Sequence, residues 1–316
     1  MADPAPFHHD VAEGPPAQAV WVMAADGVRL RLAIWRPGAS KEGDAPGTVL
    51  LFPGRTEYIE KYGRAAGVLT GMGYATISID WRGQGLADRA LSDRNTGHVM
   101  NFDDYQMDVA ALMDTARAQD LPEPYYLLAH SMGGGIGLRA LMNGLPVKAA
   151  VFSAPMWGIA LKGFMRPMAW ALGWLARRLW LGHLYAPGTK PETYVRESPF
   201  EDNVLTTDPE MFAYMQRQIA AHPELALGGP SLRWLYQALV ETRDMARNPA
   251  PDIATLTFLG SNERVVDTAP IHSRMSGWAN GKLDLIEGAE HEVMMETPET
   301  RDHVFGAIAA HFAAHR

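Results

Sequence analysis

The residues most suggestive of chemistry are one serine and the small residues around it. An apolar run at residues 125–129 is followed by His130, Ser131 and a row of glycines, which predicts a strand, a sharp turn and a helix. Such a turn holds a serine out of the sheet only if the residues two before and two after it are small, as in the G-x-S-x-G nucleophile elbow. These residues are Ala129 and Gly133. We therefore interpret Ser131 as a nucleophile, and the alternative is a turn that only packs a helix on a strand.

A serine hydroxyl is a weak nucleophile at neutral pH, so it needs a base and a group that orients the base. After such an elbow the acid and then the histidine follow along the chain. Of the 11 histidines, His291 lies directly after the last expected strand, on a loop that should return over Ser131. We expect His291 to be the base. Neighbouring side chains of a strand point to opposite faces, so we expect His130 to be a packing residue.

The acid is expected in the loop after residues 254–259, where two carboxylates compete. Glu263 lies closer to the strand end, where a residue that orients the base must sit. Asp267 lies nearer the following helix and could equally stabilise its first turn. Because this kind of triad accepts either acid, we favour Glu263 and keep Asp267 as the alternative.

An oxyanion hole requires backbone N–H groups directed at the oxygen of a tetrahedral intermediate. One comes from the residue after the nucleophile and the other from the loop after the first core strand. These positions are Met132 and Arg55. Gly54 lies beside Arg55 and would allow a substrate to approach closely, although Pro53-Gly54 is also a common simple turn.

Several motifs together resemble the α/β-hydrolases, and within them the bacterial lysophospholipase and monoacylglycerol lipase branch. They extend over most of the chain and are Pro53-Gly54-Arg55-Thr56-Glu57, Asp80-Trp81-Arg82-Gly83-Gln84-Gly85-Leu86-Ala87, Gly97-His98-Val99, Phe102-Asp103-Asp104-Tyr105, His130-Ser131-Met132-Gly133-Gly134, and His291-Glu292 with Glu296. The resemblance implies that Ser131 is the nucleophile, His291 the base, and Arg55 and Met132 the oxyanion donors. The family's acid is usually an aspartate in a Gly-x-x-Asp pattern, and this position is Glu263 here.

Strands and helices alternate along the chain in a way that would position these residues. We expect a hairpin at residues 19–23 and 28–35, strands at 48–52, 74–79, 125–130, 147–153, 254–259 and 283–286, and helices at 58–72, 102–118 and from 297 onwards. Such alternation predicts βαβ units and a mostly parallel sheet that binds ligands at the carboxyl ends of its strands. The expected fold class is α/β, specifically an α/β-hydrolase fold with helices flanking the central sheet.

The alternation stops after residue 157 and resumes at residue 254, and the segment between looks helical throughout. We expect residues 1–157 and 246–316 to form the hydrolase core. Residues 158–245 are then a helical cap inserted over the strand ends. Residues 200–206 and 228–235 also resemble the caps of lysophospholipase-like members.

The first part of this cap is basic and rich in large apolar residues. Residues 158–191 contain no Asp or Glu, and their basic residues are Lys162, Arg166, Arg177, Arg178 and Lys190. The large apolar residues are Phe164, Met165, Met168, Trp170, Leu172, Trp174, Leu175, Leu179, Trp180 and Leu181. Two interpretations stay open: a lid that contacts lipid aggregates or an acyl chain, or a helix packed on the core with a solvated basic edge. Charges interrupt every apolar window of the roughly 20 residues that a membrane span needs.

The amino-acid composition argues against several kinds of partner and site. The formal charge of -8 disfavours nucleic acid as a partner, and the absence of cysteine excludes disulfides, thiolate nucleophiles and cysteine metal sites. Residues 1–16 lack the apolar region of a signal peptide, so we expect a cytoplasmic chain with a partly disordered start. His8-His9-Asp10 has no spaced partner in the sequence and is interpreted as a solvated tail rather than a metal site.

These observations predict a serine ester hydrolase that needs no cofactor or metal. The expected substrate is a single-acyl lipid such as a lysophospholipid or a monoacylglycerol, with peripheral membrane contact through the cap as a further expectation. Two alternatives stay open: an esterase or aminopeptidase acting on small non-lipid substrates, and a non-catalytic relic of the fold that only binds a ligand. The sequence leaves the oligomeric state open.

Overall fold

A mostly parallel sheet forms the centre of the molecule. The computed structural model describes residues 3–38, 46–161 and 163–316, so Lys162, one of the basic residues named above, lies outside the described residues. In this described part, nine strands pair in the order β1-β2-β3-β5-β4-β6-β7-β8-β9. They are β1 (Asp3–Pro4), β2 (Gln18–Met23), β3 (Arg29–Trp35), β4 (Thr48–Phe52), β5 (Ala75–Asp80), β6 (Tyr125–His130), β7 (Ala149–Ser153), β8 (Ala254–Gly260) and β9 (Gly281–Ile286). The pairs from β5 to β9 are parallel, which confirms the expected α/β class.

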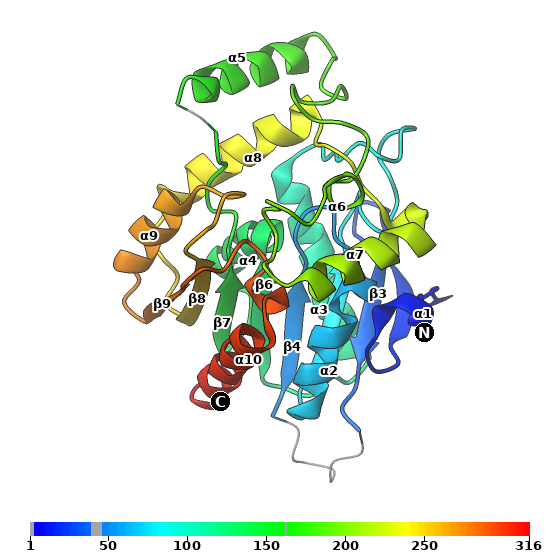
Figure 1. Cartoon of the computed structure of the whole chain (residues 1–316), viewed down its shortest axis with the longest axis vertical. Coiled ribbons are helices and arrows are strands. Elements are labelled where there is room, and N and C mark those ends of the chain that lie inside the picture. Colours follow the sequence, from blue (N-terminus) through cyan, green and yellow to red (C-terminus); the bar gives the residue numbers. More distant parts are fainter. Residues whose placement is uncertain (1–2, 39–45, 162) are drawn as a thin grey trace.

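Helices cover both faces of this sheet (Figure 1). They are α2 (Gly63–Gly71), α3 (Tyr105–Ala118), α4 (Ser131–Met142), α9 (Thr268–Ser276) and α10 (Pro298–Ala313), with short helices η1 (Ile59–Tyr62), η2 (Phe102–Asp104) and η4 (Val293–Met295). In β4, Val49 and Leu51 belong to the apolar cluster that includes α10, whereas Leu50 and Phe52 belong to the cluster that includes α3 and α4. A strand buried on both faces explains the unbroken apolar run in the sequence.

The segment between β7 and β8, residues 158–245, is called the inserted segment below. Its helices are α5 (Met165–Arg178), α6 (Tyr194–Glu197), α7 (Pro209–Ala221), η3 (Pro223–Leu225) and α8 (Leu232–Met245), and Figure 1 shows them above the carboxyl ends of the parallel strands. The expectation that this segment is helical throughout is wrong for residues 179–193 and 198–208. Pro187, Gly188 and Pro191 interrupt helix formation in the first of these stretches. No described helix combines the length and hydropathy that crossing a membrane requires.

The beginning of the chain is packed against the core rather than disordered, so the expectation for residues 3–16 is wrong. This stretch forms β1 and α1 (His9–Ala12), and Val11 and Ala12 are buried. The Tyr214 hydroxyl, from α7, donates a hydrogen bond of 2.6 Å to the carbonyl oxygen of Ala12. Val11, Ala12 and the hydrogen bond from Tyr214 therefore hold this stretch in place, although its composition alone indicated a disordered tail.

Candidate active site

The serine singled out in the sequence lies at a strained turn between a strand and a helix. Ser131 is the first residue of α4, directly after β6, and its φ of +50° is in the left-handed region. A Cβ atom at Gly133 would lie 2.2 Å from the carbonyl oxygen of Phe52. The helix can approach β4 this closely only with glycine at that position. The local geometry is that of a nucleophile elbow, with Ala129 accommodated in the first small position.

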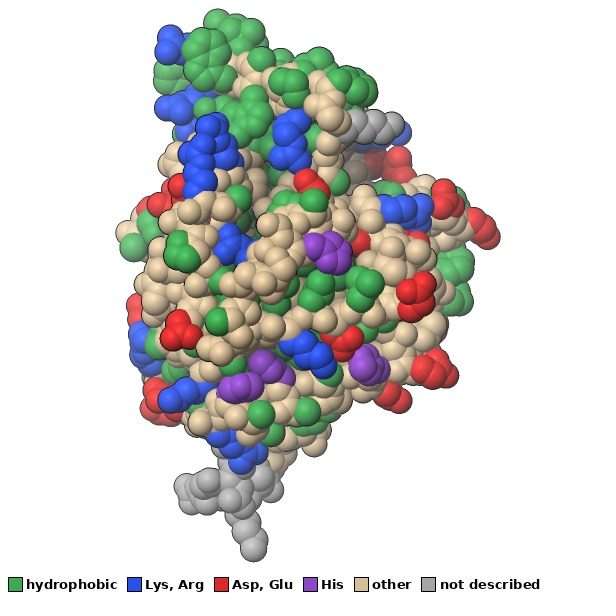
Figure 2. Space-filling model, turned by 90° about the vertical axis from the view of Figure 1, so that its left-hand side faces the viewer, with side chains coloured by type: hydrophobic (Ala, Val, Ile, Leu, Met, Phe, Trp, Pro, Cys, Tyr) green, Lys and Arg blue, Asp and Glu red, His purple; other side chains and the backbone are tan. Residues whose placement is uncertain are grey.

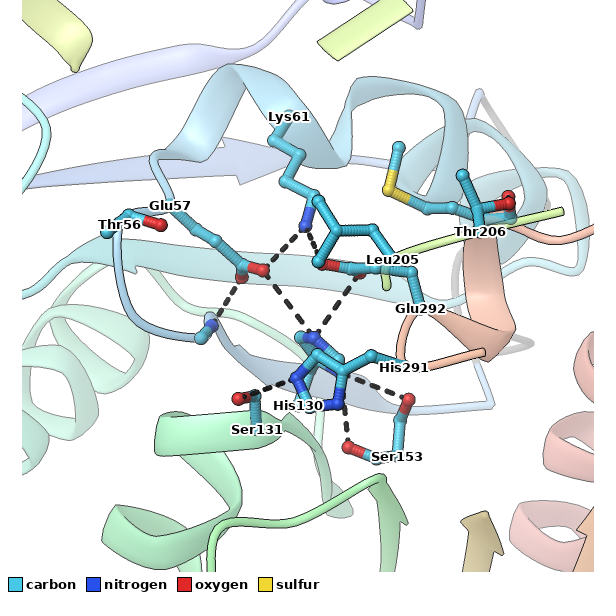
Figure 3. Close-up of polar contacts among 12 residues, drawn as sticks. Thr56, Glu57, Lys61, His130, Ser131, Ser153, Leu205, Thr206, His291 and Glu292 are labelled. Carbon is cyan, nitrogen blue, oxygen red and sulfur yellow. Dashed lines mark hydrogen bonds and ion pairs between the residues drawn. The ribbon is translucent and has the colours of Figure 1, made fainter. Parts of the chain in front are cut away.

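A chain of two hydrogen bonds connects Ser131 with His291 and Glu263. Nε2 of His291 lies 2.9 Å from Oγ of Ser131, and Nδ1 of His291 lies 2.7 Å from Oε2 of Glu263 (Figure 3 shows the serine and histidine). A carboxylate only accepts hydrogen bonds, so the imidazole proton belongs on Nδ1. Nε2 is then free to accept the proton of the Ser131 hydroxyl, which is the arrangement that general-base activation requires.

Both partners of the serine are enclosed. The side chains of His291 and Glu263 are 4% and 1% exposed. Burial disfavours the charged form of Glu263, but the hydrogen bond and charge of His291 outweigh it. Backbone N–H groups of Val265 and Val266 donate to the second carboxylate oxygen. Together these contacts hold the pKa of the Glu263 carboxyl below its usual value, so Glu263 stays ionised beside the imidazole.

The second candidate acid lies elsewhere. Asp267 is the N-cap of α9, where its side chain accepts a hydrogen bond of 3.2 Å from the backbone of Ala269. Its other oxygen lies 2.9 Å from a guanidinium nitrogen of Arg166 in the inserted segment. The structure therefore brings Glu263, and not Asp267, to His291.

Two backbone N–H groups occupy the positions expected for an oxyanion hole, one directly after Ser131 and one in the loop after β4. Among the described residues, neither the N–H of Arg55 nor that of Met132 has a hydrogen-bond partner. The N–H groups on either side of Arg55 are occupied, since they donate to the side chains of Glu57 and Gln84. The loop is thus fixed on both sides of its one free donor, as expected for a preorganised oxyanion hole.

Four charged side chains are buried beside these residues, and we call them the buried charge cluster: Glu57, Lys61, His130 and Glu292. The ammonium of Lys61 lies 2.5 Å from Glu57 and 2.6 Å from Glu292. Nε2 of His130 lies 3.5 Å from Glu57 and 3.3 Å from Glu292. Figure 3 shows the two cations facing the two carboxylates from opposite sides.

The buried charge cluster connects the three chain segments that carry the candidate site. Glu57 follows Arg55 and accepts from the N–H of Gly54, His130 precedes Ser131, and Glu292 follows His291. Breaking a buried ion pair on one side is strongly destabilising. The ion pairs of the buried charge cluster therefore fix the positions of the three loops relative to one another.

His130 is buried, as a packing residue would be, but the expectation of simple packing is wrong. Its Nδ1 lies 3.1 Å from the carbonyl oxygen of Ser153, and its Nε2 faces Glu57 and Glu292. Burial opposes protonation, yet the two carboxylates outweigh it and raise the pKa of His130 above its usual value. Lys61 was also missed in the sequence, although it lies four residues after Glu57 on an expected helix, a spacing that favours ion pairs.

Among the described residues, two groups of side chains have the composition and spacing of metal ligands. Glu57, His130 and Glu292 offer ligand atoms within 4.8 Å of one another, but the Lys61 ammonium already lies between the carboxylates. The second group is His8, Asp10 and His222 on the outer surface. The expectation that His8 and Asp10 are a solvated tail without a partner is wrong, since Nε2 of His222 lies 2.9 Å from Asp10.

A cavity of about 610 Å³ opens above Ser131 and His291. Its walls come from the core loops and from the inserted segment, and they are largely apolar. The apolar lining residues are Met156, Ile159, Val195, Val204, Leu205, Met215, Ile219, Leu227, Trp234, Val265 and Val266. Its volume is in the usual range for a small-molecule site. The arrangement can therefore hold an apolar substrate group beside an activated serine.

Comparison with known proteins agrees with this geometry. The family described as serine aminopeptidase, S33, matches residues 43–298. Lysophospholipase L2 from Escherichia coli is 32% identical over 84% of this chain and 80% of its own length. Probable lysophospholipase L2 from Haemophilus influenzae is 28% identical over 82% of each chain. A crystal structure of a monoglyceride lipase variant from Saccharomyces cerevisiae has the same fold, with a TM-score of 0.74, 20% identity, and coverage of 98% of this chain and 99% of that one.

The match covers strands β4 to β9, the elbow and the loops that carry Glu263 and His291. The family assignment and the observed sheet order lead to one conclusion. The chain belongs to the serine aminopeptidase (S33) family of α/β-hydrolases, in the branch that contains lysophospholipases and monoacylglycerol lipases, and is a serine ester hydrolase.

Proposed function

We propose that this protein hydrolyses the carboxylic ester of a single-acyl lipid, either a lysophospholipid or a monoacylglycerol. The observation that carries the proposal is the Ser131–His291–Glu263 hydrogen-bond chain at the floor of a largely apolar cavity. An acyl chain is the part of such a lipid that an apolar cavity favours, because its burial removes apolar surface from water. The similarity to the lysophospholipase L2 proteins supports the same substrate class.

In the first step, Oγ of Ser131 forms a bond to the acyl carbon while its proton passes to Nε2 of His291. The carbonyl oxygen becomes negatively charged and accepts hydrogen bonds from the N–H groups of Arg55 and Met132. Glu263 stays ionised and holds the imidazolium in place. The intermediate then collapses, the bond to the glycerol oxygen breaks, and His291 gives its proton to that oxygen.

In the second step, water attacks the acyl-enzyme. His291 takes a proton from the water, and the resulting hydroxide adds to the acyl carbon through the same oxyanion geometry. Collapse breaks the bond to Oγ of Ser131, which recovers its proton from His291. The products are a fatty acid and the deacylated glycerol compound, and neither step consumes a co-reactant other than water.

The inserted segment is proposed to act as a cap on a core formed by residues 1–157 and 246–316. It supplies one side of the cavity, including Val195, Met215 and Leu227. It is anchored to the core beside the histidine loop, where Thr206 donates to the carbonyl oxygen of Met295 and Arg301 pairs with Asp208. Such a cap would exclude water from the acyl group and select the alcohol that leaves.

The outer surface of α5 is proposed to contact lipid aggregates. Figure 2 shows apolar side chains gathered at the end of the molecule where α5 lies, with basic side chains beside them. Phe164 is 74% exposed and Trp180 is 89% exposed, while Arg177 and Arg178 are exposed at the end of α5. Exposed aromatic residues bordered by arginines are typical of surfaces that bind at the interface of an anionic membrane.

A hydrolysis panel tests the substrate class. Lysophosphatidylcholine, monoacylglycerol, a short p-nitrophenyl ester and an aminoacyl p-nitroanilide are compared by kcat/KM. We expect the two lipids to be hydrolysed most efficiently. Activity confined to the short ester would favour an esterase, and activity confined to the anilide would favour an aminopeptidase, the activity in the family's description. A wild-type protein that hydrolyses none of the four would support the non-catalytic alternative.

A further inference from the structure

One cation in the wall of the catalytic cavity has no acidic partner. Arg55 lines the cavity, and its Nη2 donates to the carbonyl oxygen of Gly228 in the inserted segment. Its guanidinium carbon lies 5.3 Å from the centre of the Trp234 ring. These contacts hold the guanidinium between the core and the inserted segment.

The other cations of the cavity wall are neutralised. Lys61 pairs with Glu57 and Glu292, and Lys190 lies 3.8 Å from Glu197. In the described part of the chain Arg55 forms no ion pair, and its buried Nε has no hydrogen-bond partner. Burial without a countercharge lowers the pKa of Arg55 to about 10. An anion in the cavity would remove this cost, because a buried cation without a partner is unfavourable.

The position of the guanidinium depends on a glycine. A Cβ atom at Gly97 would lie 2.7 Å from Nη2 of Arg55. Gly97 also pairs with the inserted segment, since its N–H donates to Gly229 and its carbonyl oxygen accepts from the N–H of Ser231. Because residue 97 has no side chain, the Arg55 guanidinium has space beside the backbone hydrogen bonds that Gly97 forms with the inserted segment.

We propose that the Arg55 guanidinium binds the phosphate of a lysophospholipid head group while the backbone N–H of the same residue binds the oxyanion. This inference rests on the proposed ester hydrolysis and names the substrate within it. In a lysophospholipid one glycerol unit separates the ester carbonyl from the phosphate. Arg55 likewise carries two groups, the backbone N–H and the guanidinium, which are separated by its own side chain. A guanidinium pairs with phosphate oxygens through two parallel hydrogen bonds, and a neutral monoacylglycerol offers no such partner.

The experiment compares two substrates that share one acyl chain, lysophosphatidylcholine and the corresponding monoacylglycerol. The variants are Arg55→Met, which removes the charge, Arg55→Lys, which keeps the charge without the planar fork, and Gly97→Ala, which displaces the guanidinium. The matched control is Arg89→Met. Arg89 donates to the carbonyl oxygens of Gly85 and Arg94 and forms no ion pair within the described residues, but it lies outside the cavity.

We expect Arg55→Met to lower the ratio of kcat/KM for lysophosphatidylcholine to that for monoacylglycerol by about 10-fold or more, mainly through KM. Arg55→Lys should recover part of the ratio, Gly97→Ala should lower it, and Arg89→Met should leave it unchanged. Equal losses on both substrates would overturn the proposal, because they would mean that Arg55 acts only through its loop. An unchanged ratio in Arg55→Met would overturn it as well.

A second measurement does not depend on lipid hydrolysis. Glycerol 3-phosphate is added as a competitor while a short p-nitrophenyl ester is hydrolysed, and oleate is tested in parallel. We expect competitive inhibition by glycerol 3-phosphate that weakens about 10-fold in Arg55→Met, again as expected for loss of a charged hydrogen bond. If only oleate inhibits, and its inhibition depends on Arg55, the site binds the carboxylate of the fatty-acid product. That result would overturn the head-group proposal. If no lipid in the panel is hydrolysed but this inhibition is observed, the proposed function fails and the anion site stands.

Discussion

Beside the catalytic serine and histidine, charged side chains are buried and paired, whereas at the two ends of α5 in the inserted segment apolar side chains are exposed. Glu57 and Lys61 are 6% exposed, and Glu292 is 4% exposed. Phe164 and Trp180, in contrast, are 74% and 89% exposed. Both arrangements are unfavourable in isolation, because charges prefer water and large apolar groups avoid it.

The two regions differ in what offsets this unfavourable free energy. In the buried charge cluster the partners belong to the same chain, so the charges fix the loops that carry Ser131 and His291. At the two ends of α5 the aromatic side chains of Phe164 and Trp180 stay exposed, and the proposed lipid contact would cover them. The buried ion pairs therefore position the loops of the site, whereas α5 is proposed to contact lipid.

The largest effect is expected from the acid that the structure brings to the imidazole. Glu263→Gln removes the charge that holds the imidazolium and should lower kcat by about 10³ to 10⁴-fold. Asp267→Asn is the matched control, because Asp267 pairs with Arg166 and caps α9 instead. We expect its kcat to stay within a few-fold of wild type. Near-normal turnover in Glu263→Gln together with a large loss in Asp267→Asn would reverse the assignment of the acid.

The next largest effect concerns the buried charge cluster. Lys61→Met leaves Glu57 and Glu292 facing each other without the ammonium between them. We expect the free energy of unfolding to fall by about 3 to 5 kcal/mol, as for other broken buried pairs, measured by urea denaturation. Lys148→Met, on an exposed lysine, should change it by less than about 0.5 kcal/mol. Similar small effects for both lysines would show that the cluster does not hold the loops.

A smaller effect is expected on the exposed side of the comparison. In Phe164→Ser with Trp180→Ser, binding to vesicles of phosphatidylglycerol and phosphatidylcholine should weaken by about 10-fold, because the interfacial apolar surface is lost. Met23→Ser is the control, since Met23 is 60% exposed on β2. The measurement is flotation on a density gradient. A wild-type protein that does not float with the vesicles contradicts the contact role of α5.

The smallest effect is a pH dependence of stability that arises from His130. Although burial opposes it, Glu292 and Glu57 raise the pKa of this imidazole above 6.5. A raised pKa means that the stabilising contribution is complete below the unfolded pKa and is lost as the pH rises through the folded pKa. Wild type should therefore lose more unfolding free energy than His130→Asn as the pH increases above 6.5. Parallel pH profiles for the two proteins would show that His130 does not pair as a cation.

The sequence was most informative where backbone rules dictate geometry. The elbow at Ser131 and the loop carrying His291 could be placed because parallel strands direct their following loops to one edge of the sheet. The sequence favoured Glu263 over Asp267 because Glu263 lies closer to the strand end, but the direction of each side chain is visible only in the structure. The sequence did not show that His130 faces two carboxylates, because Glu57 and Glu292 lie far from His130 along the chain.

The inserted segment was least predictable. Its hydrophobic content suggested continuous helix, but Pro187, Gly188 and Pro191 interrupt it, and Trp180 is 89% exposed although it lies just past the end of α5, which packs against α8. The ordered start of the chain was missed for a similar reason. Its packing depends on Tyr214, which lies about two hundred residues away in sequence, and local composition carries no information about such a contact.

The most direct test of the central claim is labelling with a fluorophosphonate, followed by mass spectrometry of the modified peptide. We expect the adduct on Ser131, no labelling of Ser131→Ala, and labelling of His291→Gln that is slower by several orders of magnitude, since the base is lost. Thermal unfolding of each variant checks that the fold is retained. An adduct on a different residue, or equal labelling of wild type and Ser131→Ala, would contradict the assignment of Ser131 as the nucleophile.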